Sequence, residues 1–241
     1  FLTFLIYKLI MEFTKSLIKG KFIKRYKRFF TDIKLNKGVV TAHCPNTGSM
    51  MGLLDEGNDV YISKNDNPKR KLKYTLEIIK VKKNLVGVNT HFANKIAFHA
   101  LSNNLIKEIS KSDKIKPEVF FDKETRFDFL IKKNENKIFV EVKNVTLFRN
   151  KKIAEFPDSV TSRGSKHLKT LIEATKKGYK CYLLFLVQIE SVENFKIAED
   201  IDIEYYKNYL LAKKAGVKFL AYRCNINSKE ITVEKKLKIL S

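Results

Sequence analysis

The chain is poor in residues that mark secreted, zinc-binding or nucleotide-binding proteins. It has no tryptophan, four prolines and three cysteines, which are Cys44, Cys181 and Cys224. An odd cysteine count without a C-x-x-C pair argues against a disulfide framework and against a zinc site. Glycine patterns for phosphate loops and dinucleotides are missing as well. Because reduced thiols suit a reducing compartment, we expect a cytoplasmic protein.

A hydrophobic run long enough to cross a membrane is also absent. The first ten residues are apolar except for Thr3 and Lys8, but a membrane span needs about 20 apolar residues. They carry neither a basic leader nor a small-residue cleavage site, as a secretion signal would. We therefore expect no membrane partner. We interpret residues 1–10 as an upstream extension or, alternatively, as a first strand or helix.

Acidic residues are outnumbered by basic ones. The sequence has 48 Lys and Arg against 26 Asp and Glu, a formal net charge of +22. A field of this size attracts polyanions and raises their encounter rate, so nucleic acid, anionic membrane and acidic protein are the candidate partners. Compositional bias is the alternative explanation, because Lys, Asn and Ile are abundant. Nucleic acid is the partner that we favour.

The hydrophobic pattern changes near residue 90 and divides the chain into residues 11–88 and residues 89–241. Short β-rich segments predict a small barrel or sandwich in the first part. Helical and strand patterns alternate in the second part, which predicts an α/β domain. The predicted strands of the first part are 21–35, 39–41, 59–63 and 74–81. The predicted helices of the second part are 94–109, 165–177 and 202–215, with strands at 127–131, 138–142, 179–189 and 217–222.

Residues 126–143, RFDFLIKKNENKIFVEVK, predict a β-hairpin that turns at residues 134–135. A two-residue loop there places Asp128 opposite Glu141. Side chains alternate along a strand, so Glu141 and Lys143 share one face. Two carboxylates and one ammonium group therefore converge on one spot of the predicted sheet.

Such a spot has a chemical use. Val140 and Val142 point to the opposite face of the strand, toward the expected core. On the face with Glu141, two opposed carboxylates repel each other unless a cation lies between them. Mg²⁺ suits oxygen ligands and phosphate substrates, and Mn²⁺ is the other candidate. We therefore predict Asp128 and Glu141 as metal ligands and Asp128, Glu141 and Lys143 as catalytic residues.

The arrangement is that of the PD-(D/E)xK nuclease fold, in which E-V-K supplies the E-x-K. The metal would polarise a phosphodiester and lower the pKa of a bound water. Lys143 would position that water or stabilise charge on the phosphorane. A solvated face of charged residues on an ordinary hairpin is the alternative interpretation.

Two basic segments could grip phosphates. Residues 19–30 interleave cations with aromatic rings and contain no acid, a pattern that neutralises phosphates and stacks on bases. Residues 161–169 lie near a predicted helix N-terminus, where backbone N–H groups favour anions. The predicted nucleic-acid contacts are Lys24, Arg25, Lys27, Arg28, Arg163, Lys166 and His167. The alternatives are a solvated strand with inward rings and a helix cap with ordinary surface lysines.

Other polar residues are given structural roles. His43 and Cys44 are too few for a zinc site, and His91 has no partner pattern. The literal Pro-Asp pair, Pro157–Asp158, follows the E-x-K triplet instead of preceding it. We interpret that pair as a turn into the next helix, with Asp158 or Ser159 near the helix entry.

Several stretches, in order along nearly the whole chain, resemble the sugar fermentation stimulation protein family. They are KRYKRF (Lys24–Phe29), TAHCPNTGSM (Thr41–Met50), SKNDNPKRKLKYTLE (Ser63–Glu77), LVGVNT (Leu85–Thr90), RFDFLI (Arg126–Ile131), VEVKNVTL (Val140–Leu147), FPDSVTSRGSKHLKTL (Phe156–Leu171), YLLFLVQ (Tyr182–Gln188) and AYRC (Ala221–Cys224). The resemblance implies a mixed α/β protein in which an N-terminal OB-like β-barrel joins a C-terminal PD-(D/E)xK nuclease-like α/β domain. It also implies a DNA-binding protein linked to the regulation of sugar fermentation genes.

One departure from the nuclease pattern leaves two functions open. Many nucleases of this fold carry an acid on the first helix, and we expect that position near residues 97–99, where the sequence reads AFH. A DNA-binding protein with a Mg²⁺-dependent phosphodiesterase centre is the first interpretation. A DNA-binding regulator with a vestigial, inactive nuclease fold is the alternative. The sequence contains no obvious base-reading helix, so we expect DNA binding without sequence specificity.

Overall fold

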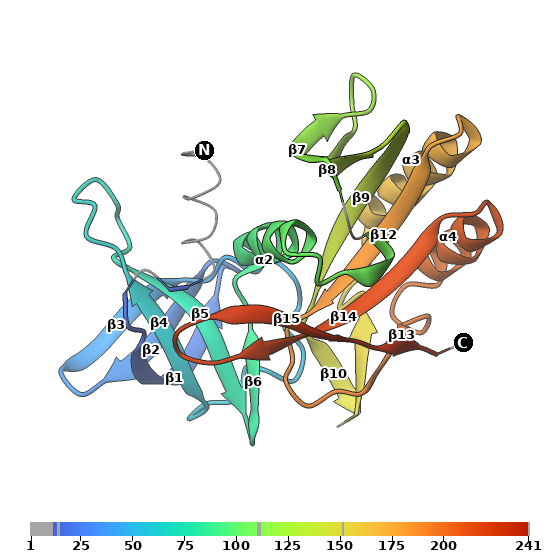
Figure 1. The fold of residues 1–241 in the computed structure, drawn as a ribbon. Helices are drawn as coiled ribbons and strands as arrows, with labels where there is room; N and C mark the ends of the chain where they lie inside the picture. Colours follow the sequence, from blue (N-terminus) through green and yellow to red (C-terminus); the bar gives the residue numbers. More distant parts are fainter. Residues whose placement is uncertain (1–11, 14, 110–111, 151, 241) are drawn as a thin grey trace.

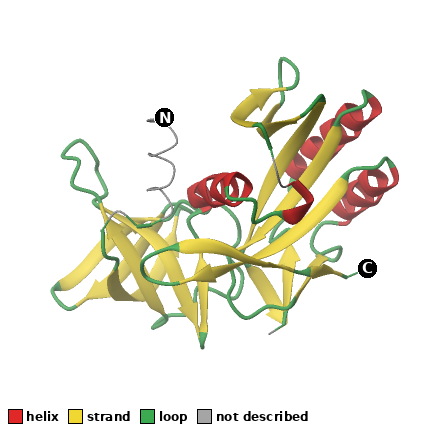
Figure 2. Ribbon diagram, in the orientation of Figure 1, coloured by secondary structure: helices red, strands yellow, loops and turns green. Residues whose placement is uncertain are grey.

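The computed structural model describes residues 12–13, 15–109, 112–150 and 152–240. The predicted extension at residues 1–10 lies outside the described residues. Figure 1 shows a barrel built by the N-terminal strands beside a larger part with a twisted sheet. In Figure 2 the helices gather in and around that larger part. Among the described residues, no helix is long and apolar enough to cross a membrane.

The first part is a closed β-barrel. Strand β1 pairs antiparallel with β2 and β4, β2 with β3, and β4 with β5, while a parallel pairing of β3 with β5 closes the cylinder. This is the strand connectivity of an OB fold, as the resemblance implied. Every strand predicted here is present. Their bounds are β1 Ile18–Tyr26, β2 Phe30–Leu35, β3 Gly38–His43, β4 Asp59–Lys64 and β5 Tyr74–Val81.

The barrel is filled by alternate side chains of its strands. Phe22 of β1, Ile33 of β2 and Ala42 of β3 are buried inside it, whereas their immediate neighbours along each strand face outward. Gly20 allows β1 to curve over this core, because a Cβ there would lie 2.6 Å from Ile33 and 2.7 Å from Leu35. The outer face is therefore free to carry the charged and aromatic residues of the basic segment.

The second part is a mixed sheet with the strand order β15-β14-β12-β9-β8-β7. Strands β9, β12 and β14 run parallel at its centre, as the long apolar run at residues 179–189 predicted. The bounds are β7 Lys114–Phe120, β8 Arg126–Lys133, β9 Asn136–Val145, β12 Lys180–Val187, β14 Lys218–Ile226 and β15 Ile231–Lys236. Strand β6, Asn84–Gly87, pairs with β5 and leads from the barrel into this part.

Helices cover both faces of the central sheet. On one face, α2 (Thr90–Ser102) packs Ala97 against Phe129 and Val140. On the other, α3 (Ser162–Lys176) packs Leu168 near Phe139, followed by α4 (Ile203–Lys214). The expectation that Val140 and Val142 face a core is confirmed, and a second core lies on the opposite face of the sheet. A parallel sheet flanked by helices is buried on both sides, so the face with Glu141 also lies beneath a helix.

The three helices begin at side-chain caps. Thr161 and Asp202 accept hydrogen bonds from the first turns of α3 and α4. Helix α2 begins at residue 90, instead of 94, because the Asn89 side chain accepts from the His91 N–H. It ends at residue 102, well before the predicted 109, where Asn104 adopts a left-handed φ of 59°.

A small second sheet was not predicted. Its strands are β10 Leu147–Asn150, β11 Ile153–Phe156, β13 Asn194–Ile197 and β16 Lys238–Ile239. Each is short, and three of the strands pair across long stretches of sequence. Local alternation over so few residues carries little signal.

Candidate nuclease centre and nucleic-acid interface

The hairpin of β8 and β9 has the predicted register. Phe129 pairs with Val140, and the pairing continues to Lys133 with Asn136, so the turn falls at residues 134–135. Extending this register by one residue places Asp128 opposite Glu141. The alternation and the two-residue loop together therefore predicted the position of both carboxylates.

Asp128 lies where the two strands separate. Its Oδ2 accepts a hydrogen bond from the Val142 N–H at 2.7 Å, in place of a backbone partner, and its Oδ1 accepts from Asn94 Nδ2 at 2.7 Å. Burial and the nearby charge of Glu141 raise the pKa of Asp128 to about 6, although these two hydrogen bonds and Lys143 oppose the rise. A carboxyl group with this pKa exchanges its proton close to neutral pH.

Asn94 is the residue that α2 directs at the centre. The position expected from the sequence, residues 97–99, was wrong, because Ala97 is fully buried in the core between α2 and the sheet. Asn94 lies beside the buried stripe of Ala93 and Ile96. The helix therefore brings an amide, and not an acid, to Asp128. An amide oxygen can bind a metal, but it adds no negative charge.

Glu141 is 2% exposed, and its two oxygens have different surroundings. Oε1 accepts hydrogen bonds from Lys143 Nζ at 2.7 Å and from His167 Nδ1. Oε2 is buried and has no hydrogen-bond partner among the described residues. Burial alone would raise the pKa of Glu141, but the charge of Lys143 and the hydrogen bonds from His167 and Lys143 hold it below its usual value. Glu141 is thus an anion with one unused oxygen.

His167 belongs to this centre. It was predicted as a nucleic-acid contact, but it is 9% exposed on the buried side of α3. Its Nε2 lies 3.4 Å from Arg163 Nε, which donates, so the ring proton sits on Nδ1 and is donated to Glu141. The histidine therefore orients Glu141. Its place four residues after Arg163 on an amphipathic helix was visible, but its partner on β9 was not.

The donor set at this centre fits Mg²⁺ or Mn²⁺. No group of three or more His, Cys, Asp or Glu side chains gathers within the described part of the chain. Mg²⁺ does not require one, because it binds through one or two carboxylates and completes its shell with water and phosphate oxygens. The unpartnered Oε2 of Glu141 is an acceptor that such a cation would satisfy. Asp128 and Glu141 are the residues that could hold it, with Asn94 beside them.

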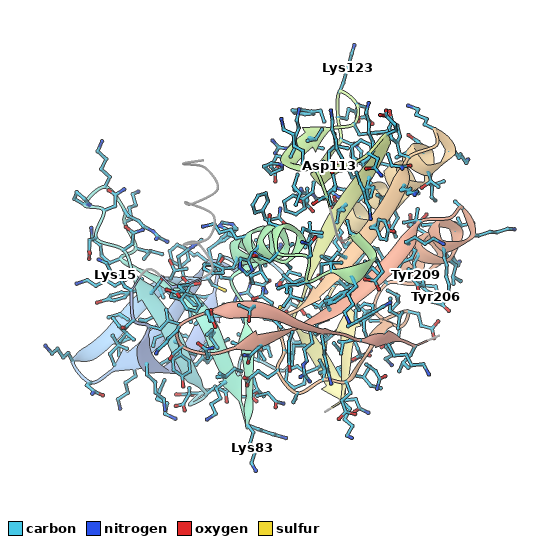
Figure 3. The ribbon with its side chains drawn as sticks, in the orientation of Figure 1. Lys15, Lys83, Asp113, Lys123, Tyr206 and Tyr209 are labelled. Carbon is cyan, nitrogen blue, oxygen red and sulfur yellow. The ribbon has the colours of Figure 1, made fainter. Side chains whose placement is uncertain are left out.

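The predicted nucleic-acid contacts fall into four groups, of which Arg25 forms one by itself. Lys24, Lys27 and Arg28 are exposed on the barrel at the β1–β2 turn. Lys166 is exposed on α3 and pairs with Glu124 at 2.9 Å. Arg163 and His167 line the centre. Figure 3 also shows Lys83 and Lys123 pointing outward from the ends of two hairpins, so basic side chains surround the molecule.

The guanidinium of Arg25 is not free, because it forms hydrogen bonds that have a structural role. It donates to the carbonyl oxygens of Asn46 at 2.7 Å and Gly48 at 3.0 Å, in the loop that follows β3. The loop is thereby fixed against the barrel. Arg25 can add charge to a nucleic-acid surface, but most of its donors are already used.

The same loop joins the two parts of the protein. Ser49 Oγ donates to the carbonyl of Asp158 at 2.6 Å, and the Met50 N–H donates to Asp158 Oδ2 at 3.2 Å. A Cβ at Gly48 would lie 2.4 Å from Asp158 Oδ2, so any larger residue there would displace the Asp158 carboxylate. As expected, Asp158 and Ser159 lie in a bend that leads into α3, whose N-cap is Thr161. Asp158 also links the barrel loop to the α/β part.

A cavity of about 710 Å³ lies elsewhere, between the small sheet and α4. Tyr206 and Tyr209 of α4 border it (Figure 3). Arg149, in its wall, is paired with Glu155 and Asp200. None of the predicted site residues lines this cavity, so it is separate from the candidate centre.

The fold and the geometry define a class of protein: an OB barrel joined to a nuclease-like α/β domain with an Asp128 and E-x-K hairpin. Two family models match the chain, the SfsA N-terminal OB domain over residues 23–88 and the sugar fermentation stimulation protein RE domain over residues 91–230. The chain belongs to the sugar fermentation stimulation protein family, which confirms the resemblance in the sequence.

Close relatives cover almost the whole chain. The sugar fermentation stimulation protein homolog of Pelagibacter ubique is 80% identical over 231 residues, which cover 96% of this chain and 100% of that protein. The homolog of Pseudoalteromonas atlantica is 44% identical over 95% of this chain and 100% of its own length. Among solved structures, Pyrococcus furiosus SfsA in complex with Ca²⁺ superposes with a TM-score of 0.87 at 25% identity, covering 96% of this chain and 99% of that chain.

Proposed function

We propose that this protein is a DNA-binding, Mg²⁺-dependent phosphodiesterase, a nuclease whose centre consists of Asp128, Glu141 and Lys143. The observation that carries the proposal is the asymmetry of Glu141. Two basic side chains occupy Oε1, while Oε2 is buried without a partner among the described residues. A buried, ionised carboxylate with a free oxygen, opposite a second buried carboxyl, calls for a cation.

Each side chain has a role that follows from its contacts. Mg²⁺ or Mn²⁺, when bound, polarises a phosphodiester and lowers the pKa of a water molecule. Glu141 would hold the cation through its unpartnered Oε2, and Asp128 through a carboxylate oxygen that also accepts a hydrogen bond. Lys143 is fixed by Glu141 at 2.7 Å, where its ammonium can position the attacking water or stabilise the developing phosphorane charge. His167 and Arg163 keep Glu141 in that orientation.

The partner that we assign is DNA, bound without sequence specificity. The net charge of +22 supplies the attraction. Lys24, Lys27 and Arg28 on the barrel, with Arg163 and Lys166 on α3, supply contacts to phosphates, and Arg25 adds charge behind them. The Ca²⁺ named with the Pyrococcus furiosus structure supports an oxygen-ligated divalent cation in a protein of this fold.

The second candidate is a DNA-binding regulator whose nuclease fold is vestigial. It is favoured by Asn94, which gives the centre an amide in place of the acid of related nucleases. With two carboxylates the centre would bind Mg²⁺ more weakly. DNA binding would then persist without cleavage.

The deciding experiment is incubation of the purified protein with supercoiled plasmid and with oligonucleotides in Mg²⁺, Mn²⁺ or EDTA. Glu141→Ala is compared with Glu173→Ala, which removes an exposed carboxylate of α3 as the matched control. We expect metal-dependent cleavage by the wild type and Glu173→Ala, and none by Glu141→Ala. DNA binding without cleavage in either metal would overturn the nuclease and leave the regulator.

A further inference from the structure

An aromatic row crosses the outer face of the barrel. The strand registers place Tyr26 of β1 opposite Phe30 of β2, and Phe30 opposite His43 of β3. Residues directly opposite on antiparallel strands project to the same side. The rings of Tyr26 and Phe30 stack with centroids 5.5 Å apart at 14°, and Phe29 stacks on His43 at 6.5 Å and 10°.

The rings of this row are not part of the barrel core. Phe22, Ile33 and Ala42 fill the core behind them, whereas Tyr26 is 38% exposed and Phe29 is 45% exposed. Single exposed hydrophobic residues are common on protein surfaces and need no explanation. Two stacked ring pairs on three neighbouring strands leave part of their apolar ring surface exposed, which suits a ligand with flat faces of its own.

Cations surround the row. Lys24 Nζ lies 5.7 Å from the centre of the Tyr26 ring. Lys27 and Arg28 form the turn at the end of the row, with left-handed φ values of 47° and 60°, and their side chains make no ion pair with any other described residue. Lys24 is paired with Asp32 at 3.9 Å. Lys27 and Arg28 beside the apolar rings therefore supply the charge for a ligand that alternates phosphates with planar bases.

The row continues toward the candidate nuclease centre. His43 has Arg70 and His91 as charged neighbours, which add to burial in lowering its pKa. His91 belongs to the first turn of α2, one turn before Asn94, and Asn94 contacts Asp128. A strand that lies along the row would therefore be led toward the carboxylates.

We propose that the aromatic row binds unpaired bases, so that the DNA substrate of this protein contains a single-stranded segment. The bases of a duplex are stacked on each other and cannot offer their faces to these rings, whereas unpaired bases can. The inference rests on the proposed function for the identity of the polymer. It assigns to the row a task that the nuclease residues do not perform.

The test measures binding in EDTA, so that cleavage plays no part. A labelled single-stranded oligonucleotide and a duplex of the same length are titrated with the wild type and with Tyr26→Ala and Phe29→Ala. Val39→Ala removes a more exposed apolar side chain from β3, away from the row, as the matched control. Each ring removed should weaken single-strand binding by about five- to hundredfold and leave duplex binding unchanged.

A second variant reports on stacking directly. Because the chain has no tryptophan, Phe29→Trp introduces a single indole into the row. Its fluorescence should be quenched by the single-stranded oligonucleotide and not by the duplex. Equal binding of both DNA forms, or single-strand binding that is unchanged in Tyr26→Ala and Phe29→Ala, would overturn the proposal. Those outcomes would leave metal-dependent plasmid cleavage and its loss in Glu141→Ala untouched, so the two proposals fail separately.

Discussion

Glu141 on β9 and His167 on α3 are joined by a hydrogen bond from the histidine Nδ1 to the carboxylate Oε1, across 26 positions of sequence. Lys143 donates to the same oxygen. The carboxylate is thereby oriented with Oε2 free. The histidine that a sequence pattern assigns to phosphate binding therefore acts, in the structure, on a carboxylate.

The first prediction concerns this hydrogen bond. His167→Ala should weaken Mn²⁺ binding by about 10- to 100-fold, because partners that orient a metal ligand contribute that much to affinity. His167→Gln, whose amide can still donate to Glu141, should recover part of the loss. Isothermal titration calorimetry without DNA measures both variants. An unchanged Mn²⁺ affinity in His167→Ala would show that Glu141 needs no orientation by the ring.

The second prediction concerns Lys143. Lys143→Met keeps the length of the side chain and removes its charge, so cleavage should fall by about 100-fold or more while DNA binding changes little. Single-turnover cleavage and fluorescence anisotropy separate the two effects. Lys137→Met, on the exposed end of the same strand, is the control. A parallel loss of binding and cleavage would instead assign Lys143 to phosphate binding.

The third prediction concerns pH. A metal must displace the proton of Asp128, whose pKa is raised to about 6 by burial and by Glu141. The carboxyl group is mostly protonated below that value and ionised above it. Mg²⁺ affinity should therefore rise with pH and be about tenfold weaker at about pH 5 than at about pH 7. Titration calorimetry across this range checks it, and a flat profile would contradict the raised pKa.

The same shift has a consequence for stability. Because the pKa of Asp128 is higher in the folded protein than the ordinary value of 3.8, the folded state prefers the protonated form. The contribution of Asp128 to stability is fully present below its pKa in the unfolded chain and is lost as pH rises through about 6. Saturating Mg²⁺ should restore the lost stability at neutral pH. A thermal melt would measure this as an increase in melting temperature.

The fourth prediction concerns Asn94. Asn94→Asp replaces a donor to Asp128 with a third negative charge, so the free energy of unfolding in EDTA should fall by on the order of 1–3 kcal/mol. In Mg²⁺, Asn94→Asp should instead be more stable than the wild type, because the added carboxylate is a better metal ligand than the amide. Thermal melts with and without Mg²⁺ measure both effects. Destabilisation in both conditions would place Asn94 outside the reach of a bound cation.

The fifth prediction concerns the contact between the loop and Asp158. Gly48→Ala should lower the free energy of unfolding by about 1–3 kcal/mol, because its Cβ would lie 2.4 Å from Asp158 Oδ2. Asp158→Ala in the same chain removes the clashing carboxylate, so the double variant should be less destabilised than the sum of the single ones. Denaturant unfolding measures all three. Additive effects would mean that the two residues act independently.

Much of the centre was predictable, because local rules determine it. The alternation of β8 and β9 and a two-residue turn fix the position of Asp128 relative to Glu141, and the structure has that register. Asn94 was not predictable in the same way. It lies at the edge of the buried stripe of α2, and it reaches Asp128 only because that helix packs over the sheet beside β8.

The remainder depends on tertiary packing. His167 reaches Glu141 only because α3 lies over the Phe139 face of the sheet, which the pattern of β9 alone does not reveal. Arg25 reads as one more surface cation, but its guanidinium faces the carbonyl oxygens of a loop about 20 residues away. The short strands β11, β13 and β16 pair with partners that are remote in sequence.

The contact of Ser49 and Met50 with Asp158 has a geometric consequence. The loop is fixed to the barrel by Arg25 and to the α/β part by Asp158, so the place where a strand is gripped and the place where it is cut belong to one rigid frame. For the nuclease that we propose, the fold then holds the DNA-binding surface and the cleavage centre at a fixed distance from each other. The ends of the cleaved fragments should therefore lie a constant number of nucleotides from the bound segment.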